Sequence, residues 1–281
     1  MRQISAEEIK KSVVNMIKDA NFFLPQTVIQ ALKEARENEE SPIGRQTLDI
    51  LLENAEIARK EQLPLCQDTG TAIFFVEIGQ DVHITGGYLR DILNEAVREA
   101  YEKFYLRKSL VTDPLFDRKN TKDNTPAMIH TEIVPGDKIK ILFAPKGGGC
   151  ENMSGLWMLT PAQGVEDIKK KVLEFVEWAG PNPCPPVVVG IGIGGSFDQC
   201  ALMAKKACLR PIGTRNPDPR YAQLELELLH AINTLGIGPM GYGGNTTALD
   251  VHIEFLPTHI TQLPLAINLQ CHSARYAEVV L

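Results

Sequence analysis

The chain has 281 residues, of which 44% are hydrophobic and 23% charged, a composition typical of a folded globular protein. Its net charge of −6 comes with no basic stripe that could neutralise phosphates, which excludes nucleic-acid partners and favours small-molecule chemistry. No stretch approaches the roughly 20 apolar residues of a membrane span, and the N-terminus lacks the apolar core of a signal peptide. We therefore expect a cytoplasmic protein without a membrane partner, whose six cysteines are not paired in disulfides because the compartment is reducing.

The first 60 residues have the spacing of helices. Ser5 followed by Glu8 fits a capping box, and apolar residues then recur every three to four positions. Pro25 and the pair Ser41-Pro42 each precede a further periodic stretch, so two more helices are expected, the last ending near Lys60. No chemistry is visible in this portion, and we interpret it as scaffold.

The loop Leu65–Thr71 combines a thiol, an amide, a carboxylate and two hydroxyls directly before the apolar run 72–76. Pro64 and Gly70 indicate a loop that enters a buried strand. Such a cluster is typical of an active site, but a tight turn in which Asp68 and Thr69 bond local backbone groups would look the same.

A strong helix is predicted over 88–105, and strands over 128–134 and 138–144 joined by a turn at 135–137. Arg107, just beyond the helix, could compensate the helix dipole or grip a carboxylate with two parallel hydrogen bonds. The run Gly147-Gly148-Gly149 after the second strand is either a flexible turn or a set of backbone N–H groups for an anion.

A helix over 165–179 leads to Cys184, which lies between two prolines and should have a stiff, extended backbone. The following strand carries Gly190, Gly192 and Gly195, which match the letter of a dinucleotide-binding fingerprint before a helix over 197–208. The fingerprint also needs a second strand ending in an acidic residue, and residues 215–220 are turn-rich instead. Close helix-to-strand approach explains the glycines better, and a nicotinamide-dependent oxidoreductase remains the rival class.

The last part contains a helix over 219–235, a glycine loop over 236–247, a strand over 248–255, a loop with His259 and a strand over 265–270. Cys66, Cys184 and Cys271 share one feature, because each lies in a loop at the edge of an apolar strand. They are too far apart in sequence for a zinc finger. They could converge on an iron–sulfur cluster with one iron left open for Lewis-acid catalysis.

Five motifs, in this order, resemble the α subunit of class I (iron–sulfur) fumarate hydratases and of the closely similar L-tartrate dehydratases. They are Leu65–Thr71, Pro145–Gly149, Asn182–Pro186 with the following Gly190–Gly195, Pro257–His259 and Asn268–His272, which together span nearly the whole chain. The resemblance implies that Cys66, Cys184 and Cys271 hold a [4Fe–4S] cluster. It also implies that Gln67, Asp68, Arg107, the Gly149 backbone and His259 surround a small dicarboxylate, with Asp68 and His259 as acid and relay.

The expected fold is α/β, an N-terminal helical portion followed by mixed sheets flanked by helices. We expect a single iron–sulfur catalytic domain over 1–281, with its helical portion at about 1–62 and its cluster-binding portion at about 63–281. The resemblance implies reversible hydration of fumarate to malate, or the same chemistry on L-tartrate. It further implies a β subunit that carries a second catalytic domain, in an α2β2-type hetero-oligomer. A non-catalytic assembly subunit is the remaining alternative.

Overall fold

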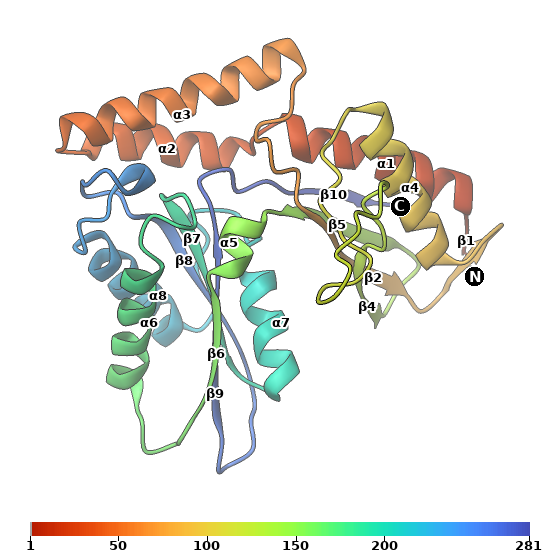
Figure 1. Ribbon diagram of the computed structural model, residues 1–281. Helices are drawn as coiled ribbons and strands as arrows, with labels where there is room; N and C mark the ends of the chain where they lie inside the picture. Colours follow the sequence, from red (N-terminus) through yellow and green to blue (C-terminus); the bar gives the residue numbers. More distant parts are fainter. Residues whose placement is uncertain (1) are drawn as a thin grey trace. The chain divides into compact units, whose positions relative to one another are not determined.

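The computed structural model describes residues 2–281, which divide into two compact units (Figure 1). Unit 1 comprises the chain up to Leu24, Ala55–Gly148 and Arg275–Leu281, and unit 2 comprises Pro25–Asn54 and Gly149–Ala274. N-terminal helices are followed by mixed sheets flanked by helices, which confirms the predicted α/β class. Within residues 2–281, no helix has both the length and the apolar character that crossing a bilayer requires.

Unit 1 is built around a mixed four-stranded sheet. Its elements are β1 (Arg2–Ser5), α1 (Ala6–Phe22), the end of α3 (Pro42–Glu61), β2 (Thr71–Gly79), β3 (Val82–Thr85), α4 (Leu89–Lys103), β4 (Met128–Val134), β5 (Ile139–Lys146) and β10 (Ala277–Val280). The strand order is β10-β5-β2-β4, and β1 pairs with β3 in a separate ribbon. β2 is antiparallel to β5 and parallel to β4, so these two consecutive strands lie on either side of β2.

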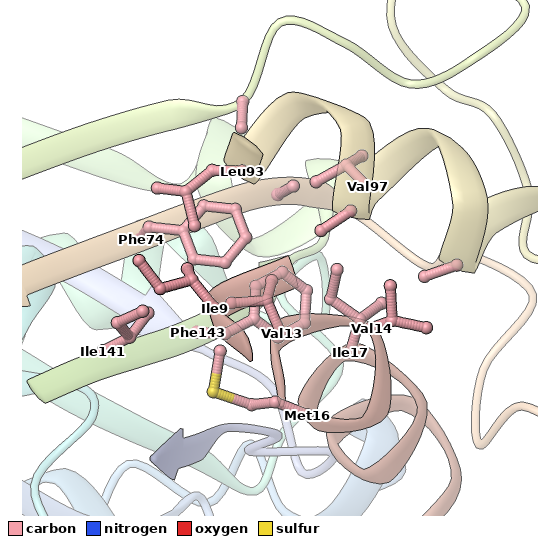
Figure 2. Packing of buried hydrophobic residues seen from close by; sticks show 14 of the residues in the cluster. Ile9, Val13, Val14, Met16, Ile17, Phe74, Leu93, Val97, Ile141 and Phe143 are labelled. Carbon is pink, nitrogen blue, oxygen red and sulfur yellow. The ribbon is translucent and has the colours of Figure 1, made fainter. Parts of the chain in front are cut away.

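The core of unit 1 lies between α1, α4 and the sheet, as Figure 2 shows. The hydroxyl of Ser5 accepts a hydrogen bond from the N–H of Glu8 at 3.2 Å, which confirms the predicted cap of α1. Apolar residues of α1 then face the rings of Phe74 and Phe143, whose centroids are 5.1 Å apart. Burial of each such side chain contributes about 1.5–3 kcal/mol, and this packing fixes the strand that follows the Cys66 loop.

Unit 2 contains a second mixed four-stranded sheet, in the order β6-β9-β7-β8. Its elements are α2 (Gln26–Asn38), most of α3, α5 (Gly148–Asn152), β6 (Ser154–Leu159), α6 (Val165–Ala179), β7 (Val187–Gly194), α7 (Phe197–Ala207), α8 (Pro219–Asn233), the short 3₁₀ helix η1 (Pro239–Gly241), β8 (Ala248–Leu256) and β9 (Leu263–Gln270). Odd-numbered residues of β7 pack with α6 and α8, whereas Gly190 and Gly192 face α7. The sheet is therefore covered on both faces.

The glycines of β7 allow α7 to lie close to the sheet. A Cβ atom on Gly190 would stand 2.1 Å from the carbonyl oxygen of Ala204, and one on Gly192 would stand 2.2 Å from that of Cys200. The prediction of close helix-to-strand approach is confirmed. Packing alone accounts for these two glycines, without a bound dinucleotide.

Candidate functional site

Asp68 is the centre of the polar loop in unit 1. Its Oδ1 accepts the N–H of Gly70 at 3.0 Å, and its Oδ2 accepts the N–H of Gly148 at 2.8 Å. The carboxylate therefore joins the loop to the glycine run after β5. Two backbone donors fix its orientation, which is the kind of preorganisation that a catalytic acid needs.

Tyr101 of α4 holds the same loop through hydrogen bonds to its backbone. Its hydroxyl donates to the carbonyl oxygens of Thr69 at 2.7 Å and Gly70 at 3.2 Å, and Asn124 Nδ2 also donates to Gly70 O. Burial raises the pKa of Tyr101, the charge of Arg275 opposes this and the charge of Asp68 adds to it. The hydroxyl accordingly stays protonated and keeps donating at neutral pH.

Three further predicted residues lie on or beside this loop. The thiol of half-buried Cys66 lies 3.4 Å from Gln67 Oε1, and the Gln67 side chain is exposed. The hydroxyl of Thr69 donates to the carbonyl oxygen of Arg107 at 2.9 Å, which holds the backbone of Arg107 against the loop. Arg107 itself is exposed. Unit 1 thus brings together Cys66, Gln67, Asp68 and Arg107.

Cys184 and Cys271 emerge at the same edge of the unit 2 sheet. β7 and β9 are antiparallel, with Val188 paired to Gln270, so the start of β7 adjoins the end of β9. The N–H of His272 donates to the carbonyl oxygen of Cys184 at 3.3 Å, and His272 Nδ1 lies 3.1 Å from that oxygen. Residues 87 positions apart in sequence are therefore neighbours, a pairing that the sequence alone does not give.

The backbone at Cys184 differs from the prediction. Flanking prolines predict an extended conformation, but the φ angle is 55°, in the left-handed region that is strained for a residue with a side chain. The N–H of Cys184 donates to Pro181 O at 3.0 Å, which closes a turn, and the N–H of Met240 holds Pro185 O at 2.7 Å. These bonds hold the backbone of Cys184 in this conformation.

Gly149 lies at the same edge. The glycine run is not a flexible turn, because Gly148 and Gly149 begin the five-residue helix α5. A Cβ atom on Gly149 would lie 3.5 Å from Asn182 O, in the turn before Cys184. Unit 2 therefore brings Gly149, Cys184 and Cys271 together.

His259 lies elsewhere in unit 2. It follows β8, which is parallel to β7, so it leaves the sheet at the edge opposite to Cys184. Roughly 23 Å of strand separates the two edges. His259 is exposed, and its Nδ1 is 2.9 Å from the hydroxyl of Thr261. The sequence predicted His259 close to the cysteine ligands. Within unit 2, however, His259 lies far from Cys184 and Cys271.

The six cysteines fall into two sets, and none is in a disulfide. Cys150, Cys200 and Cys208 are 4%, 0% and 2% exposed, and burial raises the pKa of Cys200 to about 11. Cys66, Cys184 and Cys271 are partly exposed. In the described part of the chain, no three His, Cys, Asp or Glu side chains form a ready-made site for a metal ion. The partly exposed thiols are the donor set whose chemistry fits an iron–sulfur cluster.

Sequence reasoning missed the residues that hold the Cys66 loop in place. Tyr101 reads only as one more apolar position of a helix, and Asn124 as part of a polar loop. Arg275 Nη2 donates to the carbonyl oxygen of Asp68 at 2.9 Å, over 207 positions of sequence. No local pattern could indicate these contacts, because each depends on the tertiary fold.

Comparison with known proteins agrees with this geometry. Residues 10–280 match the family model described as Fumarate hydratase (Fumerase). Over 277 residues the chain is 45% identical to the "Putative L(+)-tartrate dehydratase subunit alpha" of Methanocaldococcus jannaschii, with 96% of each chain covered. Over 278 residues it is 36% identical to the "L(+)-tartrate dehydratase subunit alpha" of Escherichia coli strain UTI89, with 98% of this chain and 91% of that one covered.

These matches define the protein class as a hydro-lyase, an enzyme that adds or removes water. The chain belongs to the fumarate hydratase (Fumerase) family, and the predicted resemblance is confirmed.

Proposed function

We propose that this chain is the α subunit of a [4Fe–4S]-dependent hydro-lyase that hydrates fumarate reversibly to malate. The observation that carries the proposal is the division of the cysteines, of which only Cys66, Cys184 and Cys271 are partly exposed. Two of these three lie at one sheet edge, joined through His272. Family membership supports the reaction class.

Cys66, Cys184 and Cys271 would hold the cluster as thiolates. Three protein ligands leave one of four irons open, and the bound cluster supplies a Lewis acid that polarises the hydroxyl to be lost. The turn at Cys184, closed by its N–H bond to Pro181, keeps one thiol in place for this purpose. The backbone strain there is a cost that a bound group would offset.

The substrate carries two carboxylates, which need fixed donors. Arg107 offers a planar fork that can grip one carboxylate with two parallel bonds. Its backbone is tied to Thr69, so the guanidinium is anchored at the loop that bears Gln67. The N–H of Gly149, which lies beside the turn before Cys184, is the proposed donor to the second carboxylate.

Addition of water across a double bond needs a proton on one carbon and hydroxide on the other. Asp68 is the proposed acid, since two amides hold its carboxylate in one orientation. His259 is the proposed relay. Because it lies at the other edge of unit 2 from Cys184, it would have to reach the site of a second α chain. The proton-abstracting base is expected from the partner.

The proposed partner is a β subunit in an α2β2-type assembly in the cytoplasm. Two similar proteins are named as alpha subunits of L(+)-tartrate dehydratases, which supports an assembly of unlike chains. We expect the isolated α chain to bind the cluster and show no turnover until the β chain is added. Full activity of the β chain alone would instead indicate that this chain only assists assembly.

L(+)-tartrate is the second candidate substrate, favoured by the names of both relatives. Fumarate, malate and tartrate are all four-carbon dicarboxylates, so the same donors would serve each. A panel of these substrates and a methylated dicarboxylate, assayed on the reconstituted two-chain complex, decides between them. Tartrate turnover without fumarate or malate turnover would overturn the first assignment and keep the reaction class.

The cluster assignment is tested by anaerobic reconstitution with iron and sulfide, followed by absorbance and EPR. Cys66→Ala, Cys184→Ala and Cys271→Ala should each lose most of the bound iron. The control Cys200→Ala, a buried cysteine of α7, should load like the wild type. Wild-type iron content in any of the three variants would remove that residue from the ligand set.

A further inference from the structure

Arg275 is a fully buried cation in unit 1, only 1% exposed. Its Nη2 donates to the backbone oxygen of Asp68 at 2.9 Å. A guanidinium has five N–H donors, and the Nε and Nη1 atoms of Arg275 have no hydrogen-bond partner among residues 2–281. The side chain is therefore directed at the Cys66 loop with most of its donors unused.

No carboxylate of the described chain neutralises this charge. The Arg275 bond goes to the main chain of Asp68, and both carboxylate oxygens of Asp68 accept backbone N–H groups instead. Tyr101, whose pKa the charge of Arg275 lowers against the effect of burial, is a protonated hydroxyl. A buried charge without an opposite charge beside it is among the costliest features of a fold, so its presence points to an anion that completes the site.

We propose that Arg275 supplies positive charge to the anionic iron–sulfur cluster held by the Cys66 loop and, through its hydrogen bond to the backbone of Asp68, positions that loop. This inference rests on the proposed function. The guanidinium is 1% exposed, so its charge acts through the loop and not by contact with a dissolved substrate. A cluster bound by three thiolates is an anion, and a positive charge near it raises its reduction potential. Arg275 also follows Cys271 by only four residues.

The experiment compares Arg275→Met and Arg275→Lys with the wild type, each as the cluster-free chain and after anaerobic reconstitution. In the cluster-free chain, Arg275→Met should leave the melting temperature unchanged or raise it, because an unpaired buried charge is removed. After reconstitution it should lose iron to a chelator about tenfold faster or more. Its cluster should also have a lower reduction potential. Arg275→Lys keeps the charge, so its rate of iron loss and its reduction potential should lie between those of the wild type and of Arg275→Met.

The matched control is Arg210→Met in unit 2, where the guanidinium has a carboxylate partner in Glu225 at 2.9 Å. That variant should lower the melting temperature of the cluster-free chain and leave the reduction potential unchanged. If both Arg275 variants show wild-type iron loss and potential, the inference is wrong while the proposed function stands. If the wild type itself takes up no cluster, the proposed function fails and the inference with it. Should Arg275→Met not fold, Arg275→Lys alone gives both readouts.

Discussion

Asp68 combines two tasks in one side chain. Its carboxylate accepts hydrogen bonds from Gly70 and Gly148, and so ties the Cys66 loop to the end of β5. Its backbone oxygen accepts from Arg275. A group held this firmly can transfer a proton without first reorganising, which is why we assign it the acid role.

The variant Asp68→Asn separates the two tasks. An amide keeps the shape but cannot accept both backbone N–H groups, so we expect the unfolding free energy to fall by about 1–2 kcal/mol. Loss of the acid should lower turnover of the two-chain complex about 100-fold or more, with iron content retained. Exposed Asp81→Asn is the control and should change neither quantity. Turnover near the wild-type value in Asp68→Asn would exclude the acid role.

Local residue patterns were predictable where the partners are close in sequence. The cap of α1 is an example, because Ser5 and Glu8 are three residues apart. The left-handed conformation at Cys184 was not predictable. The prolines on either side of Cys184 favour an extended backbone, but the hydrogen bond from Met240 to Pro185 overrides that preference. Nor were the contacts of Tyr101, whose partners lie about 30 residues away.

Among the elements, β7 and α7 depend on glycine for their separation. We expect Gly192→Ala to lower the unfolding free energy by about 3 kcal/mol, because its Cβ would overlap the Cys200 carbonyl oxygen. Gly164→Ala is the control, since a Cβ there meets nothing within 4 Å, and it should cost no more than about 1 kcal/mol. Chemical denaturation measures both. A neutral Gly192→Ala would reopen the dinucleotide explanation of these glycines, which NAD titration would then test.

A buried glutamate connects two loops of unit 2. Glu39, after α2, is 0% exposed, and its carboxylate accepts the N–H groups of Ser41, Asn245 and Thr246 at 2.8–3.0 Å. Burial alone would raise the pKa of Glu39, but the hydrogen bonds from Asn245, Ser41 and Thr246 outweigh it and lower the pKa. The glycine loop that contains Met240 is thereby anchored.

Because the pKa of Glu39 is lower in the folded chain, its stabilising effect is present above the ordinary glutamate pKa and is lost as the pH falls through the folded value. Glu39→Gln should therefore cost about 2 kcal/mol of unfolding free energy at pH 7. The difference from the wild type should shrink below about pH 4. Glu40→Gln, an exposed neighbour, should show neither effect. A pH-independent difference would exclude the charge as the cause.

Long periodic elements were predicted best. The helix expected over 165–179 is α6, with the same ends. The short strands β3 and β6 were not predicted from the sequence. They form because they pair with β1 and β9, and their own residues give only a weak strand signal. The order of strands was equally out of reach, since nothing in β4 or β5 indicates that β2 lies between them. The same limit applies to His259. Its motif can be recognised from neighbouring residues, but its position relative to Cys184 depends on the pairing of β7 with β8.

At the scale of the assembly, the placement of His259 makes a sharp prediction. If one α chain supplies the cluster and a second supplies His259, then two inactive variants, Cys184→Ala and His259→Ala, should complement each other when mixed during assembly with the β chain. Random pairing makes about half of the dimers hybrid, with one intact site in each, so activity should return to about a quarter of the wild-type value. Activity no higher than that of the separate variants would exclude a relay from a second chain.

The path of the chain through the two units also constrains how the protein folds during its synthesis on the ribosome. The edge strand β10 pairs with β5, yet all of the later stretch of unit 2 is encoded between them. At typical elongation rates that interval lasts on the order of ten seconds. During this time the main-chain groups along one side of β5 are open to wrong partners. Newly made chains should therefore need chaperone shielding until β10 emerges.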